Sequence, residues 1–134
     1  CYDYDFPKLA QSYGQLGTDI VGLPSSDWRG IDPIHTKMAA MRAIEQGHSI
    51  LRSTRFGLSA AINPIGTTEA QMSSFNQNDQ IMIAHLPKTK FFTLYALIGD
   101  LFIYTCMVLI GIYLCWILGS RFKNSIILAF QIFM

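Results

Sequence analysis

The sequence has 134 residues, of which 51% are hydrophobic and 14% charged, and its formal net charge is +1. A near-neutral chain with no basic stripe between aromatic residues is not typical of a nucleic-acid-binding protein. The high apolar fraction favours one modest domain plus a membrane segment over a purely soluble domain. Of the three cysteines, Cys106 and Cys115 lie inside an apolar run, so the sequence predicts neither a disulfide framework nor a zinc site.

The chain opens with CYDYDFP, which we interpret as the end of a buried strand that turns into a helix. Pro7 suits the first helical turn, and Asp5 is expected to cap it. On such a turn the thiol of Cys1 is presented beside the amide of Tyr2, which pairs a nucleophile with an oxyanion-stabilising donor. The alternative is a buried, inert cysteine. Because nothing precedes the strand that Cys1 ends, we expect the chain to be a fragment.

A helix and a strand follow. Residues 8–16 have helical spacing and end at Gly17, and residues 19–24 form a short apolar stretch typical of a parallel, buried strand. Sites in α/β sheets are built on loops beyond the carboxyl ends of strands, and residues 25–30 form such a loop. Trp28 is therefore a candidate pocket wall, and the alternative is a surface loop with one half-buried tryptophan.

Residues 32–46 predict the strongest helix of the soluble part, with Gly47 at its end. One face of this helix, which we interpret as the core face, carries residues at spacings of four, three and four: Ile34, Met38, Met41 and Glu45. His35 is interpreted as a surface or capping histidine. Arg42 and Glu45 are three positions apart and are expected to pair.

Four short strands are predicted next, separated by turns rich in glycine, proline and asparagine. They cover residues 49–55, 58–63, 69–74 and 80–86. The alternation of side chains expected of a strand is clearest over 81–85. A run of hairpin-like strands after a helix–strand portion indicates the later half of a layered sandwich.

Residues 101–120 contain no charge and would span about 30 Å as a helix, which is the thickness of a hydrocarbon core. The soluble part is too small to surround twenty apolar residues, so a membrane span is predicted rather than a buried core helix. Residues 125–134 are expected to be either a tail or the start of a second span. The predicted domains are residues 1–90 and 91–134.

Four stretches together resemble the carbon–nitrogen hydrolase (nitrilase) superfamily and, within it, the apolipoprotein N-acyltransferases. They are CYD with the following FP, then LPSSDW, the helix with MRAIE and its following strand LRST, and GLSAAINPIG. A single membrane helix behind the hydrolase domain is what separates these acyltransferases from soluble nitrilases. The resemblance covers residues 1–120.

The resemblance implies an α+β fold, the C-terminal portion of an αββα nitrilase-like sandwich followed by a transmembrane helix. It also implies a Glu–Lys–Cys triad in which Cys1 is the nucleophile and the amide of Tyr2 the oxyanion donor. The family's glutamate and lysine lie upstream of this chain. Asp3 stands where the acyltransferases usually have glutamate, and Asp3, Trp28 and Glu45 are candidate supporting or substrate-binding residues.

The function implied by the resemblance is transfer of a fatty acyl group from a phospholipid, through a cysteine thioester, to the N-terminal amine of a diacylglyceryl apolipoprotein. No cofactor or metal is implied, and the location implied is the bacterial inner membrane, multi-pass, with the catalytic domain on the periplasmic side. The first alternative is a membrane-anchored amidase or nitrilase that acts on a soluble substrate. The second is a non-enzymatic membrane protein, and the isolated fragment is itself expected to be inactive.

Overall fold

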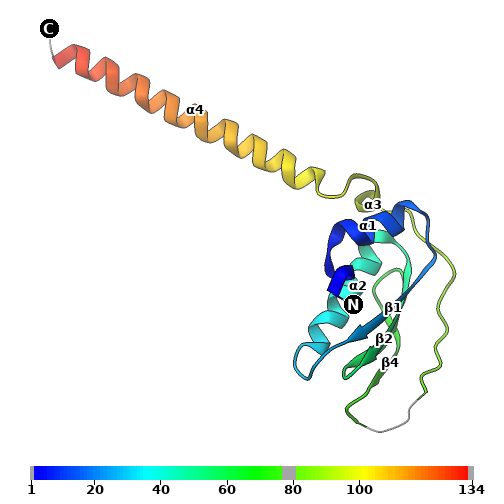
Figure 1. Ribbon diagram of the computed structural model, residues 1–134. Coiled ribbons are helices and arrows are strands. Elements are labelled where there is room, and N and C mark those ends of the chain that lie inside the picture. Colours follow the sequence, from blue (N-terminus) through cyan, green and yellow to red (C-terminus); the bar gives the residue numbers. More distant parts are fainter. Residues whose placement is uncertain (1, 77–80, 133–134) are drawn as a thin grey trace. The chain divides into compact units, whose positions relative to one another are not determined.

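The computed structural model describes residues 2–76 and 81–132, and only the backbone over 121–132 (Figure 1). The chain divides into two compact units, Cys1–Gly99 and Asp100–Met134, and each is described by itself.

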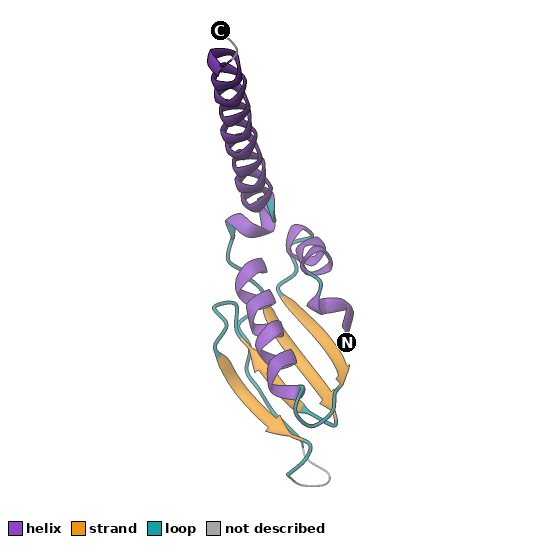
Figure 2. Ribbon diagram, turned by 90° about the vertical axis from the view of Figure 1, so that its left-hand side faces the viewer, coloured by secondary structure: helices purple, strands orange, loops and turns teal. Residues whose placement is uncertain are grey.

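The first unit consists of helices packed on one face of a sheet (Figure 2). Its elements are η1 (Tyr2–Asp5), α1 (Pro7–Gln15), β1 (Ile20–Ser26), α2 (Asp32–Gln46), β2 (Ser49–Arg55), β3 (Leu58–Ile62), β4 (Thr68–Ser73) and α3 (Leu94–Ile98). The strands follow the order β1-β2-β3-β4; β1 and β2 are parallel, and the other two pairs are antiparallel. The expected α+β class is confirmed.

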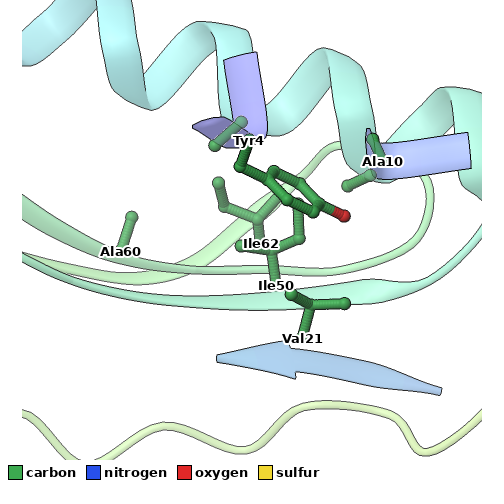
Figure 3. Packing of buried hydrophobic residues seen from close by; sticks show 8 residues of the cluster. Tyr4, Ala10, Val21, Ile50, Ala60 and Ile62 are labelled. Carbon is green, nitrogen blue, oxygen red and sulfur yellow. The ribbon is translucent and has the colours of Figure 1, made fainter. Parts of the chain in front are cut away.

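The core lies between the helical layer and the sheet. Figure 3 shows Tyr4 and Ala10 reaching from the helical layer towards side chains of three strands, Val21, Ile50 and Ile62. Side chains alternate across a strand, so Ile50 is fully buried while its neighbour Leu51 is 43% exposed on the other face of the sheet. The helices therefore cover one face of the sheet, and the core is the layer between them.

The interpretation of the methionine face of α2 as the core face was wrong. Met41 is 52% exposed, and the residues that face the sheet include Ala39 and Ala43. The small side chains of Ala39 and Ala43 let the helix lie close to the strands. The spacing of the larger apolar residues had predicted a different face of the helix as the buried one. The bounds of α2 agree with the prediction, and Gly47 ends it in the left-handed conformation with φ of 69°.

The predicted cap of α1 was also wrong. Phe6 occupies the N-cap position and makes no side-chain cap hydrogen bond. Asp5 belongs instead to η1, and its carboxylate faces His35.

The predicted strand 80–86 does not form over residues 81–86; Gln80 lies outside the described residues. Its alternation is retained, because Met82, Ala84 and Leu86 are half-buried while Ile81 and Ile83 are exposed. A strand also needs a partner ladder, and the sheet ends at β1 and β4. Alternation alone therefore predicted an extended segment correctly and its pairing incorrectly.

The second unit contains α4 (Leu101–Ile132). Within it, the 20 residues Leu101–Ser120 are long and apolar enough to cross a membrane, with a mean hydropathy of 2.4. The helix continues past this segment, so residues 125–132 extend α4 rather than forming a separate helix.

Candidate active site

A buried ionic network lies at the carboxyl end of β1, next to the predicted pocket loop. The Asp27 carboxylate is fully buried, and it accepts hydrogen bonds from Arg52 Nη2 at 2.6 Å and from His35 Nδ1 at 2.9 Å. The backbone N–H of Asp27 donates to the carbonyl of Arg55 at 3.0 Å, which continues the pairing of β1 with β2. The strand pairing thus fixes the position of the carboxylate.

Arg52 joins this carboxylate to the rest of the fold. Its Nη1 donates to the hydroxyls of Thr36 and Thr54, at 3.1 and 2.8 Å, and to the Leu58 carbonyl at 2.9 Å. The guanidinium therefore bridges β1, α2, β2 and the start of β3. A planar donor fork held by four partners is rigid, and it holds Asp27 in place.

The charge state of Asp27 determines the tautomer of His35. Burial would raise the pKa of the Asp27 carboxyl, but the hydrogen bonds from Arg52 and His35 outweigh burial and lower its pKa. An ionised carboxylate only accepts hydrogen bonds, so His35 Nδ1 carries the proton. The opposite ring nitrogen, Nε2, lies 3.8 Å from Asp5 Oδ2, and burial raises the pKa of the Asp5 carboxyl.

Two aromatic rings pack against this histidine, and a third packs against one of them. The rings of Tyr2 and Trp28 both meet His35 edge-on, with centroid separations of 6.2 and 6.3 Å, and Phe6 meets Tyr2 in the same way at 5.8 Å. Tyr2 and Trp28 are 64% and 63% exposed. The structure therefore brings two of the predicted site residues, Tyr2 and Trp28, against one histidine ring at the surface.

The remaining predicted site residues are distributed differently. Cys1 lies outside the described residues, directly before Tyr2. Asp3 is exposed and lines a hollow of about 200 Å³ beside β1, together with Tyr4, Leu23 and others. Ten positions separate His35 from Glu45, which places Glu45 about 15 Å further along α2.

Glu45 makes its contacts outside the cluster around His35. Its carboxylate pairs with Arg42, with Arg42 Nη1 and Glu45 Oε2 2.9 Å apart, which confirms the expected pair. Its backbone carbonyl accepts a hydrogen bond from the Thr93 hydroxyl. The hydrogen bond between the Glu45 carbonyl and Thr93 links α2 to the segment before α3, and Glu45 is not part of the cluster around His35.

Sequence reasoning missed the network of Asp5, Asp27, His35 and Arg52. Asp27 and Arg52 are 25 positions apart, and only the parallel pairing of β1 with β2 brings them together. One signal was available: an aspartate directly after a strand, followed eight residues later by a histidine at a helix start. Within the described ranges 2–76 and 81–132, no group of three or more His, Cys, Asp and Glu side chains could hold a metal ion.

A second buried histidine predicts a pH dependence of stability. His48 is fully buried and hydrogen-bonded through Nε2 to the Tyr4 hydroxyl, and burial lowers its pKa to about 4. Neutral His48 therefore stabilises the fold above its unfolded pKa of about 6.5, and this contribution is lost as the pH falls towards 4. We expect the free energy of unfolding of the full-length protein in detergent to fall by about 3 kcal/mol over this range.

Thermal unfolding followed by circular dichroism as a function of pH measures this effect. His48→Gln is expected to flatten the dependence between pH 6.5 and 4, and His85→Gln, which removes an exposed histidine, is expected to leave it unchanged. An unchanged slope in His48→Gln contradicts the prediction.

Curated apolipoprotein N-acyltransferases are similar to the chain over most of its length. The Borreliella burgdorferi protein is 31% identical over 129 residues, which are 93% of this chain and 24% of that protein. The Bradyrhizobium diazoefficiens protein is 36% identical over 103 residues, 75% of this chain and 19% of that protein. The chain thus spans about a quarter or less of the length of these relatives. No family model matches it.

Two solved structures have a similar fold. Saccharomyces cerevisiae Nit3, a member of branch 10 of the nitrilase superfamily, matches with a TM-score of 0.51 and 24% identity, over 55% of this chain and 31% of that chain. An amidase of Nesterenkonia sp. AN1, solved after addition of acrylamide at its active-site cysteine, matches with a TM-score of 0.51 and 21% identity, over 55% and 32%. The mixed four-stranded sheet with its helices is therefore part of the nitrilase fold.

Proposed function

We propose that this chain, a distant homologue of the apolipoprotein N-acyltransferases with part of the nitrilase fold, carries the nucleophile of a membrane-bound acyl transfer enzyme. The observation that carries the proposal is similarity to these acyltransferases over 93% of the chain. The apolar helix Leu101–Ser120 supports it, since phospholipid and lipoprotein substrates are both anchored in a membrane. Confinement of enzyme and substrates to one membrane raises their effective concentration.

In the proposed reaction the Cys1 thiolate attacks the carbonyl carbon of a phospholipid ester. The C–S bond forms, the C–O bond breaks, and the lysophospholipid leaves as an alcohol after protonation. The α-amine of a diacylglyceryl cysteine then attacks the thioester, so that a C–N bond forms and the Cys1 thiol is regenerated. The Tyr2 amide donates to the oxyanion in both steps.

The cluster around His35 includes Tyr2, which follows Cys1 directly in the sequence. Because Asp27 and Arg52 hold His35, and Tyr2 and Trp28 both pack against its ring, the residue after Cys1 is attached to a rigid part of the fold. We propose His35 as a positioning residue and Trp28 as a wall that contacts acyl chains. Asp3 lines the hollow beside β1, and we propose that its carboxylate contacts the substrate there.

The role of Trp28 gives a direct prediction. Trp28→Ala removes an exposed aromatic surface, and we expect the transfer rate on a micellar substrate to fall about tenfold through lost apolar contact. Ile65→Ala is the control, because Ile65 is 66% exposed in the turn between β3 and β4, beyond the opposite end of the sheet from Trp28. Full activity in Trp28→Ala counts against the pocket-wall role.

A second candidate function is hydrolysis of a carbon–nitrogen bond in a soluble substrate. The similarity of the sheet to that of an amidase favours it, as does aspartate at position 3. The two functions differ in the acceptor, because water releases a free acid whereas an amine yields an amide.

Product analysis tests the proposal. The full-length protein in membranes is given a phospholipid with a tagged acyl chain and a diacylglyceryl peptide, and the products are identified by mass spectrometry. N-acylated peptide is the expected product, and free acid alone indicates the hydrolase.

The proposed location is the bacterial inner membrane with the catalytic unit on the periplasmic side. The proposed reaction involves no nucleic acid and no cofactor.

A further inference from the structure

A cavity of about 490 Å³ lies in the first unit, at the ends of α1 and α2 and beside the segment that leads into α3. Its volume is within the range of sites that hold small molecules. Gln46 lines it, eleven positions and about 16 Å along α2 from His35. The cavity is therefore separate from the candidate active site.

Gln46 is the buried polar group of this cavity. Its side chain is 3% exposed, and among the described residues neither its Oε1 nor its Nε2 has a hydrogen-bond partner. Gly14 makes room for the amide, because a Cβ at position 14 would lie 2.4 Å from Gln46 Oε1. A buried amide without partners is costly. Both amide atoms are buried beneath the wall of the cavity, so a ligand reaches them when the Gln46 side chain turns towards the cavity, and the hydrogen bonds then formed remove that cost.

Lys90 supplies a positive charge at the same cavity. Its ammonium group donates to the Gly17 carbonyl at 3.1 Å, and a Cβ at Gly17 would lie 2.5 Å from its Nζ. An ammonium group has three donors, so further donors remain for an anion. No acidic side chain of the described part of the chain lines the cavity.

The remaining wall is apolar and exposed. Phe91, Phe92 and Leu97 line the cavity and are 54%, 82% and 61% exposed. The backbone that carries them is fixed, since the Phe91 N–H donates to the Gly47 carbonyl at 2.8 Å. Exposed aromatic residues beside a lysine are typical of the boundary between water and lipid. Four positions after Leu97, the apolar helix α4 begins.

We propose that this cavity binds a membrane phospholipid with an anionic headgroup. Lys90 contacts the phosphate, Gln46 contacts the ester groups of the glycerol, and Phe91 and Phe92 contact the first carbons of the acyl chains. The proposal rests on the proposed membrane insertion of α4, but not on acyl transfer at Cys1.

The test uses the full-length Cys1→Ala protein in phosphatidylcholine nanodiscs that contain a minor fraction of photoactivatable phosphatidylglycerol. Mass spectrometry quantifies the lipid crosslinked to the peptide with residues 91–97. Lys90→Gln is expected to lower this crosslink about fivefold, since the lysine that lines the cavity is removed. Lys88→Gln is the matched control, because Lys88 is an exposed lysine of the same segment that does not line the cavity.

Gln46→Leu separates binding from folding. It removes the unpaired amide, so we expect a weaker crosslink together with an unchanged or higher melting temperature. Excess inorganic phosphate is expected not to compete with the lipid. A crosslink that survives both Lys90→Gln and Gln46→Leu overturns the proposal, as does an equal loss in Lys88→Gln. Competition by inorganic phosphate overturns the lipid as the ligand.

Acyl transfer is measured separately in the protein that retains Cys1. Normal transfer without the crosslink overturns the cavity proposal alone. The crosslink without transfer supports the cavity proposal and overturns only the proposed function.

Discussion

Replacing Arg52 by methionine is expected to destabilise the full-length protein by about 3–5 kcal/mol, because it leaves the Asp27 carboxylate buried without its cation. The guanidinium also donates to two threonine hydroxyls and to the Leu58 carbonyl, and all three lose this donor, although both hydroxyls still donate to the Leu58 carbonyl. The change therefore removes one side-chain link between the end of β1 and the α2–β2–β3 portion of the fold.

Chemical denaturation in detergent, followed by circular dichroism, measures this loss. Arg55→Met is the matched control, because Arg55 lies on the same strand with its side chain exposed, over the ring of Phe56. We expect the control to change stability by less than about 1 kcal/mol.

The double variant Asp27→Asn with Arg52→Met tests the physical reason. Neutralising the carboxylate removes the unpaired buried charge, so the double variant is expected to be more stable than Arg52→Met alone. If the two changes simply add, the pair is not the source of the loss.

Replacing Cys1 by alanine is expected to lower acyl transfer by at least about 10³-fold, because the thioester intermediate has no atom on which to form. Transfer of the tagged acyl chain to the diacylglyceryl peptide measures this rate. The Tyr2 amide and the lipid contacts remain, so substrate binding is expected to persist in this variant.

Cys106→Ala and Cys115→Ala are the controls for this prediction. Both cysteines are free thiols on α4, and neither is among the residues that we assign to the reaction. Each control is expected to retain normal transfer, and a comparable loss in either one would argue against Cys1 as the single nucleophile.

Local signals in the sequence were sufficient for most elements of the fold. Helical spacing and Gly47 predicted α2 with the bounds that the structure has, and the apolar run before Trp28 predicted a parallel strand. A run of twenty residues without a charged side chain predicted the apolar helix that begins at Leu101. Each of these signals depends on backbone conformation or on burial within one segment.

Long-range pairing was beyond the reach of the sequence pattern. The period of the methionines in α2 predicted the wrong core face, because the contact surface is built from Ala39 and Ala43. Alternation over residues 81–85 did not reveal that residues 81–86 pair with none of the strands in the described part of the chain. His35 was interpreted as a surface or capping histidine. Its partner Asp27 follows β1 and the cation Arg52 comes from β2, and only the pairing of these strands brings the three side chains together.

Two of the residues chosen from the sequence lie in one cluster of the structure. Tyr2 and Trp28 were chosen from separate stretches, and the structure places both beside His35. Glu45 was chosen from the resemblance, and it pairs with Arg42 about 15 Å further along the helix. Residue types at turns and strand ends therefore led to two residues of the cluster around His35, whereas the ionic network that holds this cluster needed the three-dimensional structure.

Acylation of Cys1 is the most direct test of the proposed chemistry. The full-length protein in membranes is incubated with a phospholipid that carries a tagged acyl chain, and mass spectrometry examines the peptide that contains Cys1. We predict a tag at Cys1 that hydroxylamine removes and that is absent in Cys1→Ala, as a thioester requires. A Cys1 that iodoacetamide alkylates but phospholipid does not acylate would contradict lipid acyl transfer, and a Cys1 that neither reagent modifies would contradict both enzymatic functions.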